Sequence, residues 1–327
     1  MKKLILLLSI LYFYGCNQSQ KSDDSKKNTE DISVKKVMIP EGKKLLETHC
    51  FVCHNPTTPH EERVAPPMIA IKTHYIDEGT SEEDFTNDFL QFLQNPTKEK
   101  AKMKGAVRKF GVMPYQKFND TDLKKIASYL YNYQIEEPTW FKEHWESKKG
   151  KAYINSGKKV SLEKTAKTPE EIGMHYAMET KKLLGKNLMG TIQNSGTINA
   201  LKFCNQNAYT LTDSMATRFK ATIQRVSDKP RNPQNMANAE ELNIIEEYKR
   251  VVHNNGSIEP VTKQIEKGTK FYYPIITNKM CLQCHGAPNT QIKTETLQEL
   301  ARLYPTDKAQ GYDTNQVRGI WSITFKN

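Results

Sequence analysis

The first part of the chain carries apolar residues at the three- and four-residue spacing of helices that bury one face. This spacing predicts helices over residues 41–50, 82–93 and 120–133. Asp120 is a candidate N-cap for the last of them. The loop that contains Pro66 and Pro67 excludes a helix, because proline lacks an amide hydrogen and restricts the residue before it. Residues 38–136 are therefore expected to form an all-α domain.

The pattern changes in the second part of the chain, where helical and strand signals alternate. Thr168 and Pro169 are typical of a helix start, as N-cap and first helical residue. Helical spacing predicts helices over residues 169–191, 197–219 and 240–252. Short apolar or alternating runs predict strands over residues 222–226, 271–276 and 319–325. We expect an α+β domain at residues 171–327, joined to the first domain by a linker at residues 137–170.

The N-terminal residues 1–16 have the character of an export signal. Two lysines precede an apolar run at residues 4–14 that is too short to span a bilayer. The following Gly-Cys16 resembles the lipobox of bacterial lipoproteins, in which the cysteine becomes the lipid-bearing N-terminus. An ordinary signal peptide with an incidental cysteine is the alternative. Residues 17–37 are polar and charged, so a flexible tether is expected there.

The pentapeptide C-x-x-C-H occurs twice, ending at His54 and at His285. It is the attachment motif of a c-type haem. Two thiols at this spacing can form thioether bonds to the two vinyl groups on one porphyrin edge, and the histidine ligates the iron. A lone C-x-x-C would also suit a redox dithiol or half of a zinc site. Because a histidine follows both copies, we expect two covalently attached haem c groups, held by Cys50, Cys53, Cys281 and Cys284.

The first domain resembles class I cytochrome c in the order of its parts. A helix enters C-x-x-C-H, and a proline-bearing loop, a Met-Pro pair and a closing helix follow. The resemblance implies that His54 and Met113 are the axial ligands and that the carbonyl of Pro66 holds the histidine. A thioether ligand favours ferrous iron and raises the reduction potential. Met68 and Met103 compete with Met113 but lack its Gly-x-Met-Pro setting. The other histidines of the domain are expected at the surface, namely His49, His60 and His74.

The second domain resembles a family of bacterial c-type haem domains with a PAS-like fold, often of unknown function. The matching stretches are Phe203-Cys204, Arg225-Val-Ser with Arg231-Asn-Pro, Cys281 to Gly286, and Tyr304-Pro to Gly319-Ile. The resemblance implies that Cys204 ligates the second iron opposite His285. A thiolate donor lowers the reduction potential, whereas a small buried apolar cysteine is the alternative. Candidates for contacts with haem propionates, or for shaping the pocket, are Arg225, Arg231 and Asn232.

The cysteine count and the net charge limit which disulfides and which binding partners are expected. Of six cysteines, one is assigned to lipid, four to thioethers and Cys204 to iron, which leaves none for disulfides. The net charge of +11 accompanies an apolar fraction of 37% and a mean hydropathy of −0.70. The lysines are scattered and no recognition motif accompanies them, so nucleic-acid binding is not expected. A basic surface suits an acidic redox partner protein or is simply a solvated face.

These features predict an exported, lipid-anchored dihaem cytochrome c that transfers single electrons at the cell envelope. Its location would be the periplasm, the outer membrane or the cell surface, with a membrane contact through the lipid. We expect no enzyme activity beyond the redox change of iron. A redox or gas sensor is the alternative from another class, because displacement of a cysteine ligand would open an iron position. A dihaem peroxidase fits less well, since peroxide chemistry needs an open position with a nearby acid–base group.

Overall fold

The computed structural model describes residues 40–150, 153, 155–160 and 167–326. The predicted signal peptide, Cys16 and the tether lie outside these residues. The three helices predicted in the first part are present, as α1 (Glu41–His49), α3 (Glu82–Gln94) and α5 (Asp120–Asn132). The N-cap of α5 is Asn119, one residue before the predicted one, and its side chain accepts a hydrogen bond from the amide of Thr121.

Helix α1 crosses α5 at a glycine. A β-carbon added to Gly42 would lie 2.1 Å from the carbonyl oxygen of Lys125, so only a hydrogen side chain permits this approach of the two backbones. Around the crossing, Leu46, Ile126 and Leu130 are fully buried. Because Cys50 is the C-cap of α1, the crossing also determines where the first C-x-x-C-H motif begins.

Four short helical segments of the first part were not predicted. They are η1 (His60–Glu62), α2 (Met68–Tyr75), α4 (Lys104–Phe110) and α6 (Phe141–Lys149). Helix α2 begins directly after Pro67, where the predicted proline loop ends. Helix α6 lies in the segment expected to be a linker, and its Phe141 and Trp145 are buried in the core of the first part. The tertiary packing of these aromatic rings therefore orders a stretch whose local pattern is weak.

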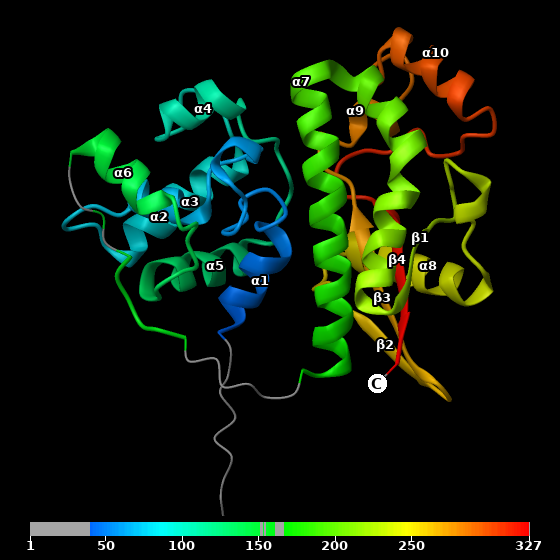
Figure 1. Cartoon of the computed structure of the whole chain (residues 1–327), viewed down its shortest axis with the longest axis horizontal. Coiled ribbons are helices and arrows are strands. Elements are labelled where there is room, and N and C mark those ends of the chain that lie inside the picture. The colour runs from blue at the N-terminus through cyan, green and yellow to red at the C-terminus, as the bar shows by residue number, and fades with distance from the viewer. Residues whose placement is uncertain (1–39, 151–152, 154, 161–166, 327) are drawn as a thin grey trace, which may run out of the picture. The chain divides into compact units, whose positions relative to one another are not determined.

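The second part begins with a long helical element, α7 (Pro169–Phe219), which starts at the predicted N-cap Thr168. The structure adds a capping box between Thr168 and Glu171. The predicted break at residues 192–196 is a reversal at Gly196, whose φ of 78° is favourable for glycine alone. Ring stacking between Tyr176 and Phe219, with centroids 4.3 Å apart, shows that the two halves run in opposite directions (Figure 1). The element α7 is thus a hairpin of two antiparallel helices.

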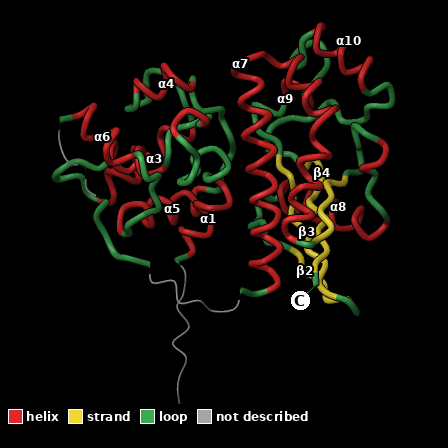
Figure 2. The backbone as a smooth tube through the Cα atoms, in the orientation of Figure 1, coloured by secondary structure: helices red, strands yellow, loops and turns green. Residues whose placement is uncertain are grey.

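A four-stranded antiparallel sheet follows, with strand order β1-β4-β3-β2. Its strands are yellow in Figure 2. Its strands are β1 (Ala221–Val226), β2 (Val261–Ile265), β3 (Gly268–Ile276) and β4 (Val317–Phe325). The predicted strands correspond to β1, β3 and β4. Strand β2 was missed because four of its five residues are exposed and it lacks an apolar alternation.

The sheet is covered on both faces, which explains the continuous apolar run of β3. Phe271 and Tyr273 pack toward α7, whereas Tyr272 packs toward α8 (Ala239–His253). In β4, Trp321 and Ile323 face α7 and Ile320 faces α8. The remaining elements are η2 (Pro233–Asn235), α9 (Leu282–His285) and α10 (Thr294–Leu303). The predicted α+β class of the second part is confirmed.

Candidate functional site

The first C-x-x-C-H motif forms a tight turn at the end of α1. The amide of Cys50 donates to the carbonyl of Leu46 at 2.9 Å, and the amide of His54 donates to the carbonyl of Cys50 at 2.9 Å. The turn gathers two thiols and an imidazole within five residues. Burial raises the pKa of Cys50 to about 12 and lowers the pKa of His54 to about 4. Both groups are therefore neutral at pH 7.

The imidazole of His54 is held from behind by a backbone carbonyl. Its Nδ1–H donates to the carbonyl oxygen of Pro66 at 2.7 Å, and the residue is only 8% exposed. The predicted contact between Pro66 and the histidine is confirmed. Since Nδ1 carries the proton, the lone pair of Nε2 is free to bind a metal ion.

The second motif repeats this arrangement in a different scaffold. Cys281 is the N-cap of α9, and the amide of His285 donates to the carbonyl of Cys281 at 2.9 Å. The Nδ1–H of His285 donates to the carbonyl of Ala309 at 2.8 Å. Burial lowers the pKa of His285 well below its usual range. The Nε of Arg318 lies 3.3 Å from the same Nδ1. Because this nitrogen carries the proton that it donates to Ala309, it cannot also accept a hydrogen bond from Arg318.

Arg231 connects the parts of the second motif. Its Nη2 donates to the carbonyl of Cys284 at 2.5 Å, and its Nε donates to Asp307 at 3.1 Å. Asp307 is itself buried, with a side chain 4% exposed, and also accepts from the amide of Ala309 at 2.8 Å. These contacts give Arg231 a structural role at the second motif. Asn232 caps the short η2 helix through its side chain.

We expect Arg231→Leu to destabilise the protein by about 3–5 kcal/mol, because it leaves the Asp307 carboxylate buried without its cation. Urea unfolding of the full chain measures this loss. Arg302→Leu is the matched control: Arg302 pairs with Glu299 on α10 but its side chain is 63% exposed, so the loss should be at most about 1 kcal/mol. Equal losses in the two variants would contradict the assigned role of Arg231.

Cys204 lies on the face of α7 that meets the second motif. One helical turn earlier, Leu201 packs in an apolar cluster with Cys284, Ile292 and Leu300. Two turns earlier, the hydroxyl of Thr197 donates to the side-chain oxygen of Gln283, within the motif, at 2.8 Å. Residues three and four apart share one helix face, so the side chain of Cys204 points toward this motif.

The surroundings of Cys204 contain two cations. Burial raises the pKa of the Cys204 thiol, while the charges of Arg225 and Arg231 act against this rise. Within the described parts of the chain, the guanidinium group of Arg225 has no acidic partner and no hydrogen bond. Negative charge on Cys204, Tyr209 or Tyr304 would raise its pKa, which burial lowers. A negative group in this pocket would therefore meet uncompensated positive charge.

The three methionines considered as ligands of the first iron differ in burial. Met68 is 2% exposed and belongs to the core at the start of α2. Met103 and Met113 are partly buried and pack against the same core as Cys50. Met113 lies in the loop after Gly111, and the nearby carbonyl of Tyr115 accepts from the amide of Lys279, two residues before Cys281. Met68 thus packs inside the core, whereas Met103 and Met113 are only partly buried.

The surface positions predicted for three histidines are wrong in part. His49, His60 and His74 are each partly buried rather than exposed. His74 packs edge-on against Trp145 and donates from Nδ1 to the carbonyl of Ala70 at 2.7 Å. For His60 and His74 the cause is α6 and its N-cap Trp140, whose rings pack against these histidines and were not expected to belong to a helix. His49 instead packs edge-on against Phe118.

The group that holds His285 could not be found from sequence patterns, whereas Pro66, which holds His54, was predicted. A backbone carbonyl such as that of Ala309 has no residue-type signature, and its place depends on the tertiary fold. Asp307 was noted only as part of a matching stretch. Met189 was also missed; its sulfur lies 3.5 Å from the Sγ of Cys53, and methionines in a helix are usually read as core residues.

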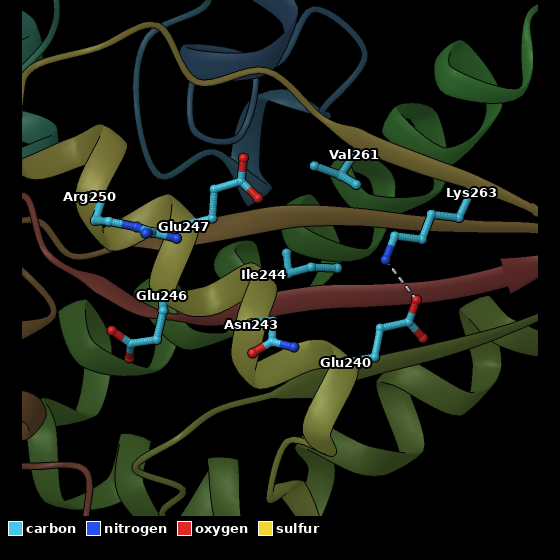
Figure 3. Close-up of a pocket in the computed structure, with 8 residues that line it drawn as sticks. All are labelled: Glu240, Asn243, Ile244, Glu246, Glu247, Arg250, Val261 and Lys263. Carbon is cyan, nitrogen blue, oxygen red and sulfur yellow. Dashed lines mark hydrogen bonds and ion pairs between the residues drawn. The ribbon is translucent and has the colours of Figure 1, made fainter.

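Other features of the described residues lie away from the motifs. A groove of about 440 Å³ runs along α8 and β2, lined by acidic and basic side chains such as Glu240, Arg250 and Lys263 (Figure 3).

Within the described ranges, no group of three or more His, Cys, Asp or Glu side chains could hold a metal ion, and five cysteines are free of disulfides. None of the described helices combines the length and apolar character required to cross a bilayer.

Comparisons with known proteins bear on the second half of the chain. A family model described as Tll0287-like matches residues 122–326. Among solved structures, the chain is similar to the crystal structure of the cyanobacterial haem protein Tll0287, with 20% sequence identity and a TM-score of 0.39. That match covers 49% of this chain and 98% of the other. No curated protein matches the chain.

Proposed function

Since the chain belongs to the Tll0287-like family, we propose that it is a dihaem c-type cytochrome that transfers single electrons at the bacterial cell envelope. A member of the family with a solved structure is a haem protein. The observation that carries the proposal is the pair of C-x-x-C-H turns. Each turn holds a neutral histidine by its Nδ1–H on a backbone carbonyl, at 2.7 Å for His54 and 2.8 Å for His285.

The residues of both sites suit a covalently attached haem. Four free cysteines stand at the spacing that thioether attachment requires, and both histidines present a free Nε2. Met113 would supply the second axial ligand of the first iron, and Cys204 that of the second. A haem iron held in this way would supply one-electron oxidation and reduction.

The protein residues would set two different reduction potentials. The thioether of Met113 is a soft neutral donor that stabilises ferrous iron, whereas a thiolate at Cys204 stabilises ferric iron. Arg225 and Arg231 favour the thiolate form, and the uncompensated charge of Arg225 also suits a haem propionate. A high-potential first site and a low-potential second site follow from these donors.

The test is a count of haems followed by a redox titration. The purified full chain should carry two covalent haems, resolved in the titration as two one-electron steps of different spectrum. Carbon monoxide added to the reduced protein should bind slowly or not at all at both haems. Rapid binding at one haem would favour the sensor alternative, and robust turnover of peroxide would favour a peroxidase. A purified chain with fewer than two covalent haems would refute the proposal.

A lipid on Cys16 would hold the protein at the membrane surface. Its redox partner protein would present an acidic surface to the basic chain. We expect Cys16→Ser to move most of the protein from the membrane fraction to the soluble fraction when cells are fractionated, because one lipid-bearing residue is lost. Cys204→Ser serves as the control that should stay with membranes. Unaltered fractionation of the Cys16 variant would contradict the anchor.

A further inference from the structure

One face of the first half of α7 lies along the first attachment motif. A β-carbon added at Gly185 would lie 3.3 Å from a methyl group of Val52, so the helix backbone contacts the motif there. One turn later, the Sδ of Met189 lies 3.5 Å from the Sγ of Cys53. Lys181 stands one turn before Gly185 on this face, because residues four apart in a helix lie one above the other.

Lys181 also lies close to the second motif. Negative charge on Cys50, Cys53 or Cys281 would raise the pKa of Lys181, so its ammonium group lies near all three thiols. The segment before Cys281 reaches the first part independently, since the amide of Lys279 donates to the carbonyl of Tyr115 at 3.3 Å. The ammonium group of Lys181 is thus near the thioether-forming cysteines of both sites.

The charge of Lys181 has no counter-ion in the described parts of the chain. No ion pair or hydrogen bond of its ammonium group is found there, and Glu179, the nearest acidic residue in sequence, pairs with Lys182 at 3.4 Å. The residue as a whole is partly exposed, but its charged end is enclosed by protein, which lowers its pKa. A buried unpaired cation is costly, so a structural role alone does not explain a lysine at this position.

We propose that Lys181 is a shared electrostatic residue that raises the reduction potential of both haems. The inference rests on the proposed dihaem function. Reduction removes one positive charge from each iron centre, so a nearby cation stabilises the reduced state relative to the oxidised state at both sites. Because the field acts through protein rather than bulk water, screening by solvent is weak.

Lys181→Met tests this inference, since it keeps the length and apolar stem of the side chain and removes the charge. The equilibrium constant for reduction is expected to fall about tenfold at each haem, equivalent to about 59 mV for a one-electron couple. Spectroelectrochemical titration of the full chain measures both potentials. Lys181→Arg keeps the charge and should leave both potentials close to the wild-type values.

The matched control is Lys182→Met, because Lys182 is the next residue and its charge is already paired with Glu179. It should shift neither haem. A shift at one haem only, at neither haem, or an equal shift in the methionine and arginine variants would overturn the role of Lys181. The haem count is taken first: fewer than two covalent haems in the wild-type chain would refute the dihaem function itself, whereas two haems with unaltered potentials refute only this inference.

Discussion

Replacement of Cys204 by serine is expected to change the absorption spectrum of one haem and to raise its reduction potential. A thiolate donates more charge to iron than a hydroxyl group does, so its loss destabilises the ferric state. The expected rise is on the order of 0.1 V, within the span of about 0.8 V over which axial ligands set haem potentials. Spectra recorded during a redox titration measure both effects.

The first haem is the internal control in this experiment, because its histidine lies in a different scaffold from Cys204. Its spectrum and potential should stay unchanged. Arg225→Leu provides a second comparison: it removes the uncompensated cation beside Cys204 but keeps the thiol. An unchanged spectrum of both haems in Cys204→Ser would show that the sulfur is a buried apolar group and not a ligand.

Removal of both thiols of the second motif, by Cys281→Ala with Cys284→Ala, should reduce the number of covalent haems from two to one. Thioether bonds require both the thiols and their spacing, and the first motif lies on a separate turn after α1. Mass measurement of the denatured chain counts the haems that remain attached. We expect the remaining haem to keep the high-potential step of the titration.

The reciprocal variant, Cys50→Ala with Cys53→Ala, is the matched control. It should also retain one haem, but the low-potential step should survive in place of the high-potential one. The two variants together assign each step to a motif. If both variants kept two covalent haems, or if the same step survived in both, the assignment of one haem to each motif would be wrong.

Local patterns predicted much of the secondary structure. Apolar spacing and cap residues predicted the helices α1, α3 and α5, the N-cap at Thr168 and three of the four strands. Helix α6 and strand β2 were not predicted. Helix α6 is stabilised by aromatic residues buried against distant helices, and β2 is stabilised by pairing with β3, so neither carries a strong local signal.

The attachment chemistry, too, is a local property of the chain. Two cysteines and a histidine within five residues form the same turn in both motifs, because a short hydrogen-bonded turn brings them together regardless of the surrounding fold. The sequence alone therefore predicts where two haems would be attached and which histidine would serve each. It also identified Pro66, since a proline loop in that position accompanies the motif in the family it resembles.

Apart from Pro66, only the tertiary structure decided what surrounds each histidine. The carbonyl of Ala309, the pair of Arg231 with Asp307, and the nearness of Lys181 to both motifs depend on segments far apart in the chain. Hydrogen bonds and electrostatic interactions act through space, and their partners leave no regular spacing in the sequence. The residue type and position of each motif thus depend on the local sequence. The groups that surround the motifs are positioned by the tertiary fold, including the reversal of α7 at Gly196 and the sheet that packs against α7.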